Sequence, residues 1–176
     1  MALKNRKGMV TYAYSDWNVN HFANGIMKIR GGKHTDVPIH RSLKENENEG
    51  IDYYVKPDPN FKDATYDVCH PEIRERINVG EFLFFRTLWR ESPYFFGYFH
   101  IGEKIDGEKG PILKADMWGR FPYTMPISEE TVLNLNPKAK DSHARSFNEW
   151  VNYNLGYRRY LELDEQRTDY LLNVMK

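Results

Sequence analysis

The feature that most constrains the fold is the segment EFLFFRTLW, residues 81–89. Apolar side chains occupy consecutive positions in it instead of alternating with polar ones. A strand with so little alternation has to be covered on both faces. The segment therefore predicts a buried strand in the interior of a sheet.

Two further strands are predicted directly after this one. Residues 94–105 and 112–118 are rich in aromatic and β-branched side chains, and DGEKG at 106–110 is typical of a hairpin tip. Gly97 and Gly102 lie inside the first of these strands, where glycine marks a bulge or a sharp bend. We therefore expect a curved antiparallel meander.

The remaining elements are shorter. We expect strands at 10–17 and 51–57, a short helix that begins at Pro71 and ends at Asn78 and Gly80, and a helical tail. In that tail, Ser128, Asp141 and Asp164 are candidate N-caps for helices over 128–135, over 141–156 and from 164 onward. Together these elements predict one α+β domain over 1–176, whose sheet forms a small, curved, mostly antiparallel β-barrel with flanking helices and a helical C-terminal tail. Residues 43–50 are expected to form a flexible acidic loop.

The charge balance limits the partners that the chain can bind. Its 25 basic residues equal its 25 acidic residues. A groove for duplex DNA or RNA normally gives a net basic chain, whereas a pocket for one nucleotide does not require one. No apolar run is long enough to span a bilayer, and the basic N-terminus lacks the apolar core of a secretory signal. A single cysteine fits a reducing compartment. We therefore expect a cytoplasmic protein without a membrane partner.

The sequence lacks the usual signatures of metal and cofactor binding. Its six histidines do not form HxH or HExxH patterns, and no phosphate-binding or dinucleotide-binding glycine motif is present. We expect neither a metal nor a cofactor. Cys69 and His70 precede a helix, where a cysteine can become nucleophilic. The competing interpretation is a buried structural cysteine beside a capping or surface histidine.

Three arginines are candidates for binding phosphate: Arg74 near the predicted helix start, Arg86 in the apolar strand, and Arg159 in the tail. They could instead pair with nearby glutamates or neutralise the end of a helix. Aromatic residues near strand ends, above all Trp17, Trp89 and Tyr98, could stack a base, or could simply be core. Asp16 and Asn18 flank Trp17 and could hydrogen-bond the edge of that base.

The pattern Cys69-x-Pro71-x-Ile73-Arg74, followed by Gly80 and an apolar strand, resembles the nucleotide-modification-associated domains, which are similar to the PUA, ASCH and EVE superfamily. Glu81 stands where that family has Asp. The tail from Leu155 to Leu163 is also similar to tails of such domains.

This resemblance implies a PUA-like barrel without catalytic activity that recognises a modified base or a nucleotide in nucleic acid, in a setting of DNA modification, restriction or RNA metabolism. It implies that Arg74 is a ligand contact. Two alternatives remain open. The chain could be an enzyme acting on a nucleotide or modified base, with Asp16, Cys69 or His70 as reactive groups, or a protein-interaction module without a ligand.

Overall fold

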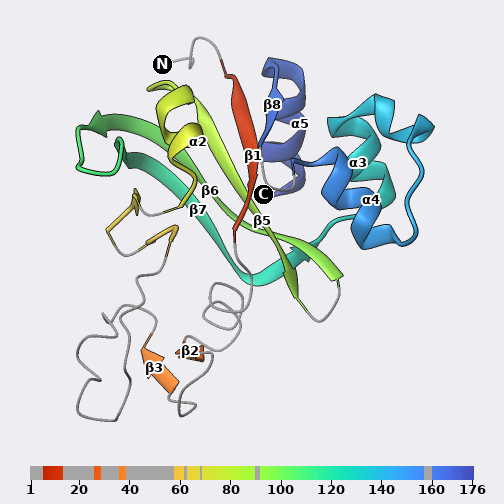
Figure 1. Ribbon diagram of the computed structural model, residues 1–176, viewed down its shortest axis with the longest axis horizontal. Coiled ribbons are helices and arrows are strands. Elements are labelled where there is room, and N and C mark those ends of the chain that lie inside the picture. The colour runs from red at the N-terminus through yellow and green to blue at the C-terminus, as the bar shows by residue number, and fades with distance from the viewer. Residues whose placement is uncertain are drawn as a thin grey trace.

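The computed structural model describes residues 6–13, 26–28, 36–38, 58–61, 63–67, 69–89, 92–156 and 160–176, with the backbone alone at 26–28, 36–38, 88–89 and 120–124. The elements, in chain order, are β1 (Gly8–Tyr12), β2 (Ile26–Lys28), β3 (Asp36–Pro38), β4 (Thr65–Tyr66), α2 (Pro71–Arg76), β5 (Phe82–Trp89), β6 (Ser92–Ile105), β7 (Ile112–Pro126), α3 (Glu129–Leu135), the 3₁₀ turn η2 (Pro137–Asp141), α4 (Phe147–Asn154), β8 (Tyr160–Leu163) and α5 (Glu165–Val174) (Figure 1).

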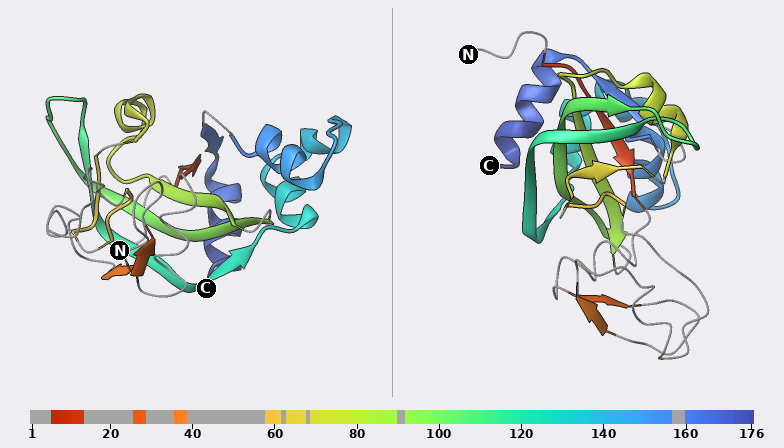
Figure 2. Two further views of the ribbon diagram at one scale, coloured as in Figure 1. Left: turned by 60° about the horizontal axis from the view of Figure 1, so that its bottom comes forward. Right: turned by 90° about the vertical axis from the view of Figure 1, so that its left-hand side faces the viewer.

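Six of these strands form one sheet in the order β4-β7-β6-β5-β1-β8, and β2 pairs with β3 in a separate ladder. Every described pairing is antiparallel except β1 with β5, which run parallel. The meander β5-β6-β7 confirms the prediction for the middle of the chain. Strands β6 and β7 are long and curved (Figure 2). The ladder ends at β4 and β8 and does not close within the described residues, so the fold is α+β with an open, mixed sheet.

Strand β5 separates two hydrophobic cores, as its composition predicted. Phe82, Leu83, Phe84 and Phe85 are all buried. Leu83 and Phe85 belong to a core that α2 covers, which we call the α2-side core. Phe82 and Phe84 belong to the α5-side core, which α3, α4, β8 and α5 complete on the opposite face. The sheet is therefore the middle layer of the molecule.

The glycines of the meander make room for side chains of neighbouring segments. The ladder shifts register at Gly97, and a Cβ there would overlap the ring of Phe61. A Cβ on Gly119 would overlap the ring of Tyr98, so that ring lies across β7. These residues are glycine because an aromatic ring occupies the volume that a side chain would need.

Two of the three predicted N-caps are confirmed. The Ser128 hydroxyl accepts the Thr131 N–H, and the Asp164 carboxylate accepts the Arg167 N–H. The prediction of Asp141 was wrong, because Asp141 ends the 3₁₀ turn η2. Ser146 caps α4 instead, and it stands three residues before Glu149, the spacing of a capping box. The helix therefore begins later than its apolar pattern suggested.

Further differences concern strands. The first strand is Gly8–Tyr12 instead of 10–17, β7 continues to Pro126, and β8 was not predicted. The predicted strand at 51–57 and the acidic loop at 43–50 lie outside the described residues. In the part of the chain that is described, each helix is too short and too polar to cross a bilayer.

Because β5 is buried on both faces, truncating one of its rings should destabilise the fold more than truncating an exposed ring. Phe85→Ala should lower the free energy of unfolding by about 3 to 5 kcal/mol, because the side chain is fully buried. Phe147→Ala is the matched control, since Phe147 is 44% exposed on α4. Urea denaturation of both variants measures the difference. Equal losses in the two variants would contradict the assignment of Phe85 to the core.

Candidate functional site

Of the three arginines predicted to bind phosphate, the structure describes the side chains of Arg74 and Arg86. Both are buried. Arg74 is 1% exposed and donates to three backbone oxygens, those of Cys69, Lys109 and Pro111. It therefore ties the start of α2 to the tip of the β6-β7 hairpin. Its guanidinium is committed to backbone carbonyls, and its phosphate role stays a prediction that this geometry does not support.

Arg86 has a comparable environment on the opposite face of the sheet, where it contacts α4. It donates to the Leu155 carbonyl and to Oδ1 of Asn152, which joins β5 to α4. Its Cζ lies 5.1 Å from the centroid of the Tyr12 ring, within cation–π range. Strand β5 thus carries a buried cation whose charge is stabilised by the protein itself, and a phosphate role for Arg86 also stays a prediction.

Cys69 belongs to a partly buried polar cluster at the start of α2. Asp58 accepts the backbone N–H groups of Asp67 and Cys69. Burial raises the pKa of the Asp58 carboxyl to about 6, and burial together with the nearby Asp58 charge raises the pKa of the Cys69 thiol to about 12. A thiol with such a pKa stays protonated at neutral pH, so it is a poor nucleophile. Tyr66, also buried, has its pKa raised well above the usual value by the same desolvation.

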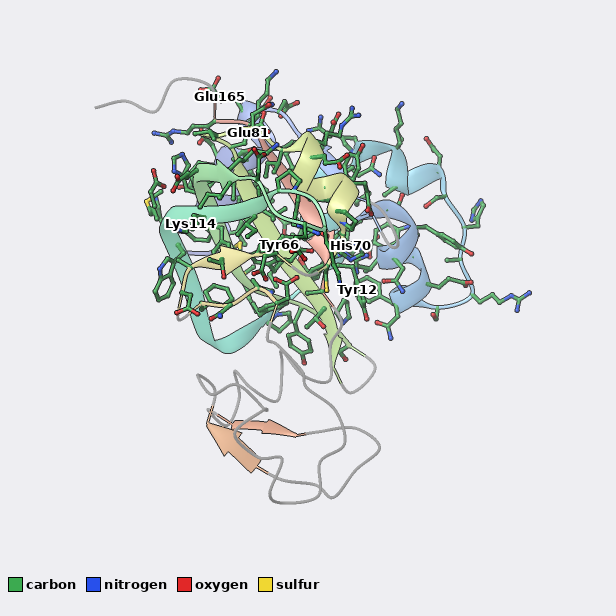
Figure 3. The ribbon with its side chains drawn as sticks, turned by 60° about the vertical axis from the view of Figure 1, so that its left-hand side comes forward. Tyr12, Tyr66, His70, Glu81, Lys114 and Glu165 are labelled. Atoms are coloured by element: carbon green, nitrogen blue, oxygen red, sulfur yellow. The ribbon has the colours of Figure 1, made fainter. Side chains whose placement is uncertain are left out.

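His70 lies beside this cluster, and its position is conformationally unusual. It has a φ of 46°, in the left-handed region, and precedes Pro71 as the N-cap position of α2. Its Nε2 lies 3.0 Å from the Tyr12 carbonyl oxygen, and its Nδ1 lies 3.4 Å from Glu72 (Figure 3). These contacts connect α2 to the end of β1. They give His70 a structural role at this junction.

A pocket of about 360 Å³ lies on the α5 side of the sheet and contains one of the predicted base-binding residues. We call it the Tyr98 pocket; its lining residues are Arg6, Phe82, Tyr98, Met117, Asp169, Leu172, Asn173, Met175 and Lys176. Tyr98 is half-buried, and its ring lies near those of Phe82 and Phe84. The strands supply an apolar floor, and α5 and the segment before β1 supply polar walls.

Among the lining side chains of the Tyr98 pocket, two are cationic (Arg6 and Lys176) and one is anionic (Asp169). Arg6 pairs with Asp169 at 2.9 Å, and Lys176 donates to the side-chain oxygen of Asn173. Neither Arg74 nor Arg86 lines this pocket. Tyr98 therefore lines a pocket together with Arg6 and Lys176, and not with the arginines that the sequence suggested.

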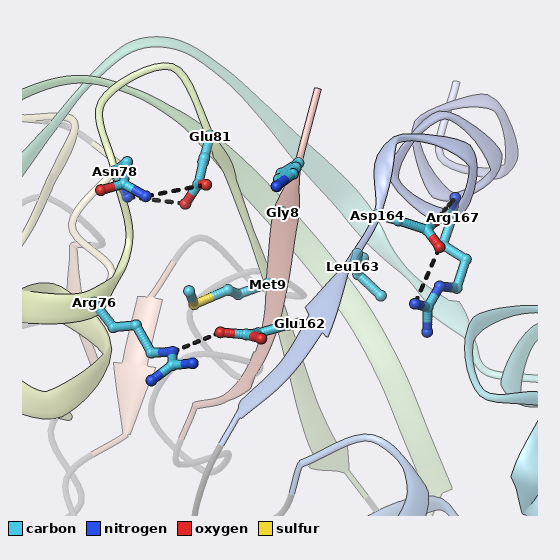
Figure 4. Close-up of a pocket in the computed structure, with 10 residues that line it drawn as sticks. Gly8, Met9, Arg76, Asn78, Glu81, Glu162, Leu163, Asp164 and Arg167 are labelled. Carbon is cyan, nitrogen blue, oxygen red and sulfur yellow. Dashed lines mark hydrogen bonds and ion pairs between the residues drawn. The ribbon is translucent and has the colours of Figure 1, made fainter. Parts of the chain in front are cut away.

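A second cavity, of about 500 Å³, lies at the start of β1 and the end of β8 (Figure 4). Arg76 pairs with Glu162, Arg167 pairs with Asp164, and Glu81 accepts two hydrogen bonds from Asn78. Among the described residues, its lining contains no aromatic ring, and its three cationic residues are matched by three acidic ones. It offers neither a stacking surface nor a surplus of positive charge.

The other predicted contacts cannot be placed. Asp16, Trp17, Asn18 and Arg159 lie outside the described residues, as does the side chain of Trp89, whose backbone ends β5. Arg6, Met117 and Lys176 also line the Tyr98 pocket and were not predicted from the sequence. A signal for Met117 existed, because a hairpin folded about the predicted tip at 106–110 brings β7 alongside Tyr98. No pattern in the sequence predicts that residues of α5 line the same pocket.

Burial of Arg74 yields a prediction that separates a structural from a phosphate-binding role. Arg74→Met should destabilise the fold by about 2 to 4 kcal/mol, because it removes a buried guanidinium that donates to three backbone carbonyl oxygens. Arg76→Met, two residues away on an exposed side chain, should leave the unfolding midpoint nearly unchanged. Chemical denaturation of both variants tests this. A stable Arg74→Met protein that binds nucleic acid with a lower salt slope would restore the phosphate role.

The Asp58 carboxyl should make stability depend on pH. Its pKa rises from 3.8 to about 6 on folding, so its stabilising contribution is fully present below about pH 4 and is lost as the pH rises through about 6. The pKa difference of about two corresponds to about 3 kcal/mol. The stability of the native protein relative to Asp58→Asn should fall by that order between pH 4 and pH 7. Denaturation at four pH values measures this, and a constant difference would refute it.

Comparisons with known proteins give no precedent for this arrangement. The chain has no significant match among protein-family models, curated proteins or solved structures. The resemblance to the nucleotide-modification-associated domains therefore stays a prediction. The structure shows what the motif residues do here: Pro71 begins α2, Ile73 packs in the α2-side core, and Arg74 holds the hairpin tip.

Proposed function

We propose that this chain is a non-catalytic domain that recognises a nucleotide, or a modified base within DNA or RNA, and that the base enters the Tyr98 pocket. The observation that carries the proposal is the composition of that pocket. A tyrosine ring, a phenylalanine ring and a thioether form its floor, and Arg6 and Lys176 stand at its walls. Rings stack bases whatever their sequence, and cations attract the adjoining phosphates.

The dimensions and the overall charge agree with a small ligand. A volume of about 360 Å³ falls in the usual range for ligand pockets. The chain has no net charge, which disfavours a long phosphate-tracking groove. A single base with its phosphate therefore fits the pocket better than a duplex does.

The proposal extends to the type of fold. The curved meander β5-β6-β7 with helices packed against it is compatible with the PUA-like barrel that the sequence motif implies. The link to DNA modification or RNA metabolism rests on the same motif. The enzyme alternative is disfavoured by the pKa of about 12 for the Cys69 thiol. A thiol with this pKa is protonated at neutral pH and is a poor nucleophile.

The ring of Tyr98 provides the direct test. Tyr98→Leu removes the ring but keeps apolar bulk, and it should weaken binding of single-stranded DNA or RNA oligonucleotides about ten- to hundredfold, as expected for one lost base stack. Tyr98→Phe keeps the ring and should bind within about threefold of the native protein. Fluorescence anisotropy with oligonucleotides carrying unmodified and methylated bases measures both.

The control is Tyr153→Leu, because Tyr153 is 67% exposed on α4, away from the pocket. It should leave affinity unchanged. Trp17→Ala and Trp89→Ala belong in the same assay, since both were predicted from the sequence to stack the base. A folded Tyr98→Leu protein with native affinity would refute the assignment of the Tyr98 pocket.

A further inference from the structure

The histidine at position 100 lies between the residues that form the floor of the Tyr98 pocket. In the ladder, His100 is opposite Phe82 on β5 and opposite Met117 on β7. Tyr98 precedes it by two positions on β6. Residues that are opposite each other, or two apart in one strand, project to the same face of a sheet. His100 therefore projects to the face on which the pocket lies, and its ring centroid is 4.7 Å from that of Phe82.

A local irregularity of the sheet brings a carboxylate to this histidine. His100 pairs with Met117 and Ile101 pairs with Ala115, so Asp116 is an extra residue of β7, a β-bulge. Asp116 Oδ1 lies 2.5 Å from Nδ1 of His100. A Cβ on Gly102 would overlap the Asp116 side chain, so glycine at 102 makes room for it. Bulges of this kind re-aim side chains and are over-represented next to functional sites.

The carboxylate fixes the tautomer of the ring. An ionised carboxylate only accepts hydrogen bonds, so Nδ1 carries the hydrogen that it donates to Asp116. In the neutral imidazole, Nε2 is then an acceptor with a free lone pair. This atom is shielded from solvent and has no hydrogen-bond partner among the residues that the structure describes. A buried acceptor without a partner is destabilising, and a ligand that donates a hydrogen bond to it removes that penalty.

From this geometry we infer that His100, oriented by Asp116, selects bases that present an N–H donor, such as the exocyclic amine of adenine or cytosine, in the Tyr98 pocket. The inference rests on the proposed function of that pocket. His100 is not itself part of the pocket lining, whereas Met117, which lies opposite it and is 43% exposed, is. The inference therefore requires the unbranched Met117 side chain to rotate so that the base reaches Nε2. Tyr98 holds the plane of the base, and His100 reads its edge.

The test compares bases that differ only in the donor. Single-stranded oligonucleotides carry one central adenine or cytosine, or the corresponding purine or pyrimidin-2-one base that lacks the amine. The native protein should bind one of the amino bases about tenfold more tightly than its desamino partner, the value of one hydrogen bond to a buried acceptor. Anisotropy titrations measure this ratio of dissociation constants.

Two variants test whether His100 and Asp116 produce this ratio of dissociation constants. His100→Phe keeps a ring against Phe82 but has no acceptor, and it should reduce the ratio to about one while the desamino base binds as before. Asp116→Ala should also reduce the ratio, because the tautomer of His100 is no longer fixed. Asp116 is 57% exposed, so this variant is expected to fold even if His100→Phe does not. Glu103→Ala, on the same hairpin, is the control and should keep the native ratio.

The outcomes separate this inference from the proposed function. Binding that depends on Tyr98 but does not distinguish amino from desamino bases overturns the role of His100 alone. A native ratio that survives in Asp116→Ala and in folded His100→Phe also overturns it. Absence of binding to all four oligonucleotides, or binding that Tyr98→Leu leaves intact, overturns the base pocket and the inference together.

Discussion

The burial of β5 on both faces is the constraint on which the rest of the structure depends. Because Leu83 and Phe85 face one core and Phe82 and Phe84 face the other, the strand has to lie inside the sheet with a layer on each side. The meander supplies the strand on one side and β1 supplies the other. The same arrangement places Phe82 under α5, so the floor of the Tyr98 pocket is a by-product of the core.

Buried arginines show how such a sheet accommodates charge. Arg74 and Arg86 are both among the largest fully buried side chains, and each donates to backbone oxygens of a distant segment. Backbone carbonyls beyond helix and strand ends need donors, and a guanidinium offers several in a fixed geometry. These side chains therefore act as tertiary links. By contrast, Arg6 and Lys176, which line the Tyr98 pocket, contact side chains of α5: Arg6 pairs with Asp169, and Lys176 donates to Asn173.

The sequence predicted the strongly patterned parts of the fold and little of the site. Local signals located β5, β6, the hairpin tip and the caps at Ser128 and Asp164, because each depends on neighbouring residues. The pocket joins the start of β1, the meander and α5, which only tertiary packing brings together. Tyr98 was predicted as a base-stacking residue only because it is aromatic and lies in a predicted strand. The burial of Arg74 and the bulge that turns Asp116 toward His100 depend on register, which spacing along the chain does not reveal.

The position of β1 has a consequence for the order of folding. This strand, near one end of the chain, pairs in parallel with β5 and antiparallel with β8, whose Leu163 lies opposite Gly8. Both pairings close very long loops, whereas β5, β6 and β7 need only short turns. Non-local pairings of this kind slow folding. We therefore expect the meander to assemble as an early unit and β1 to join it late, together with β8, so that the Tyr98 pocket is among the last parts of the molecule to become ordered.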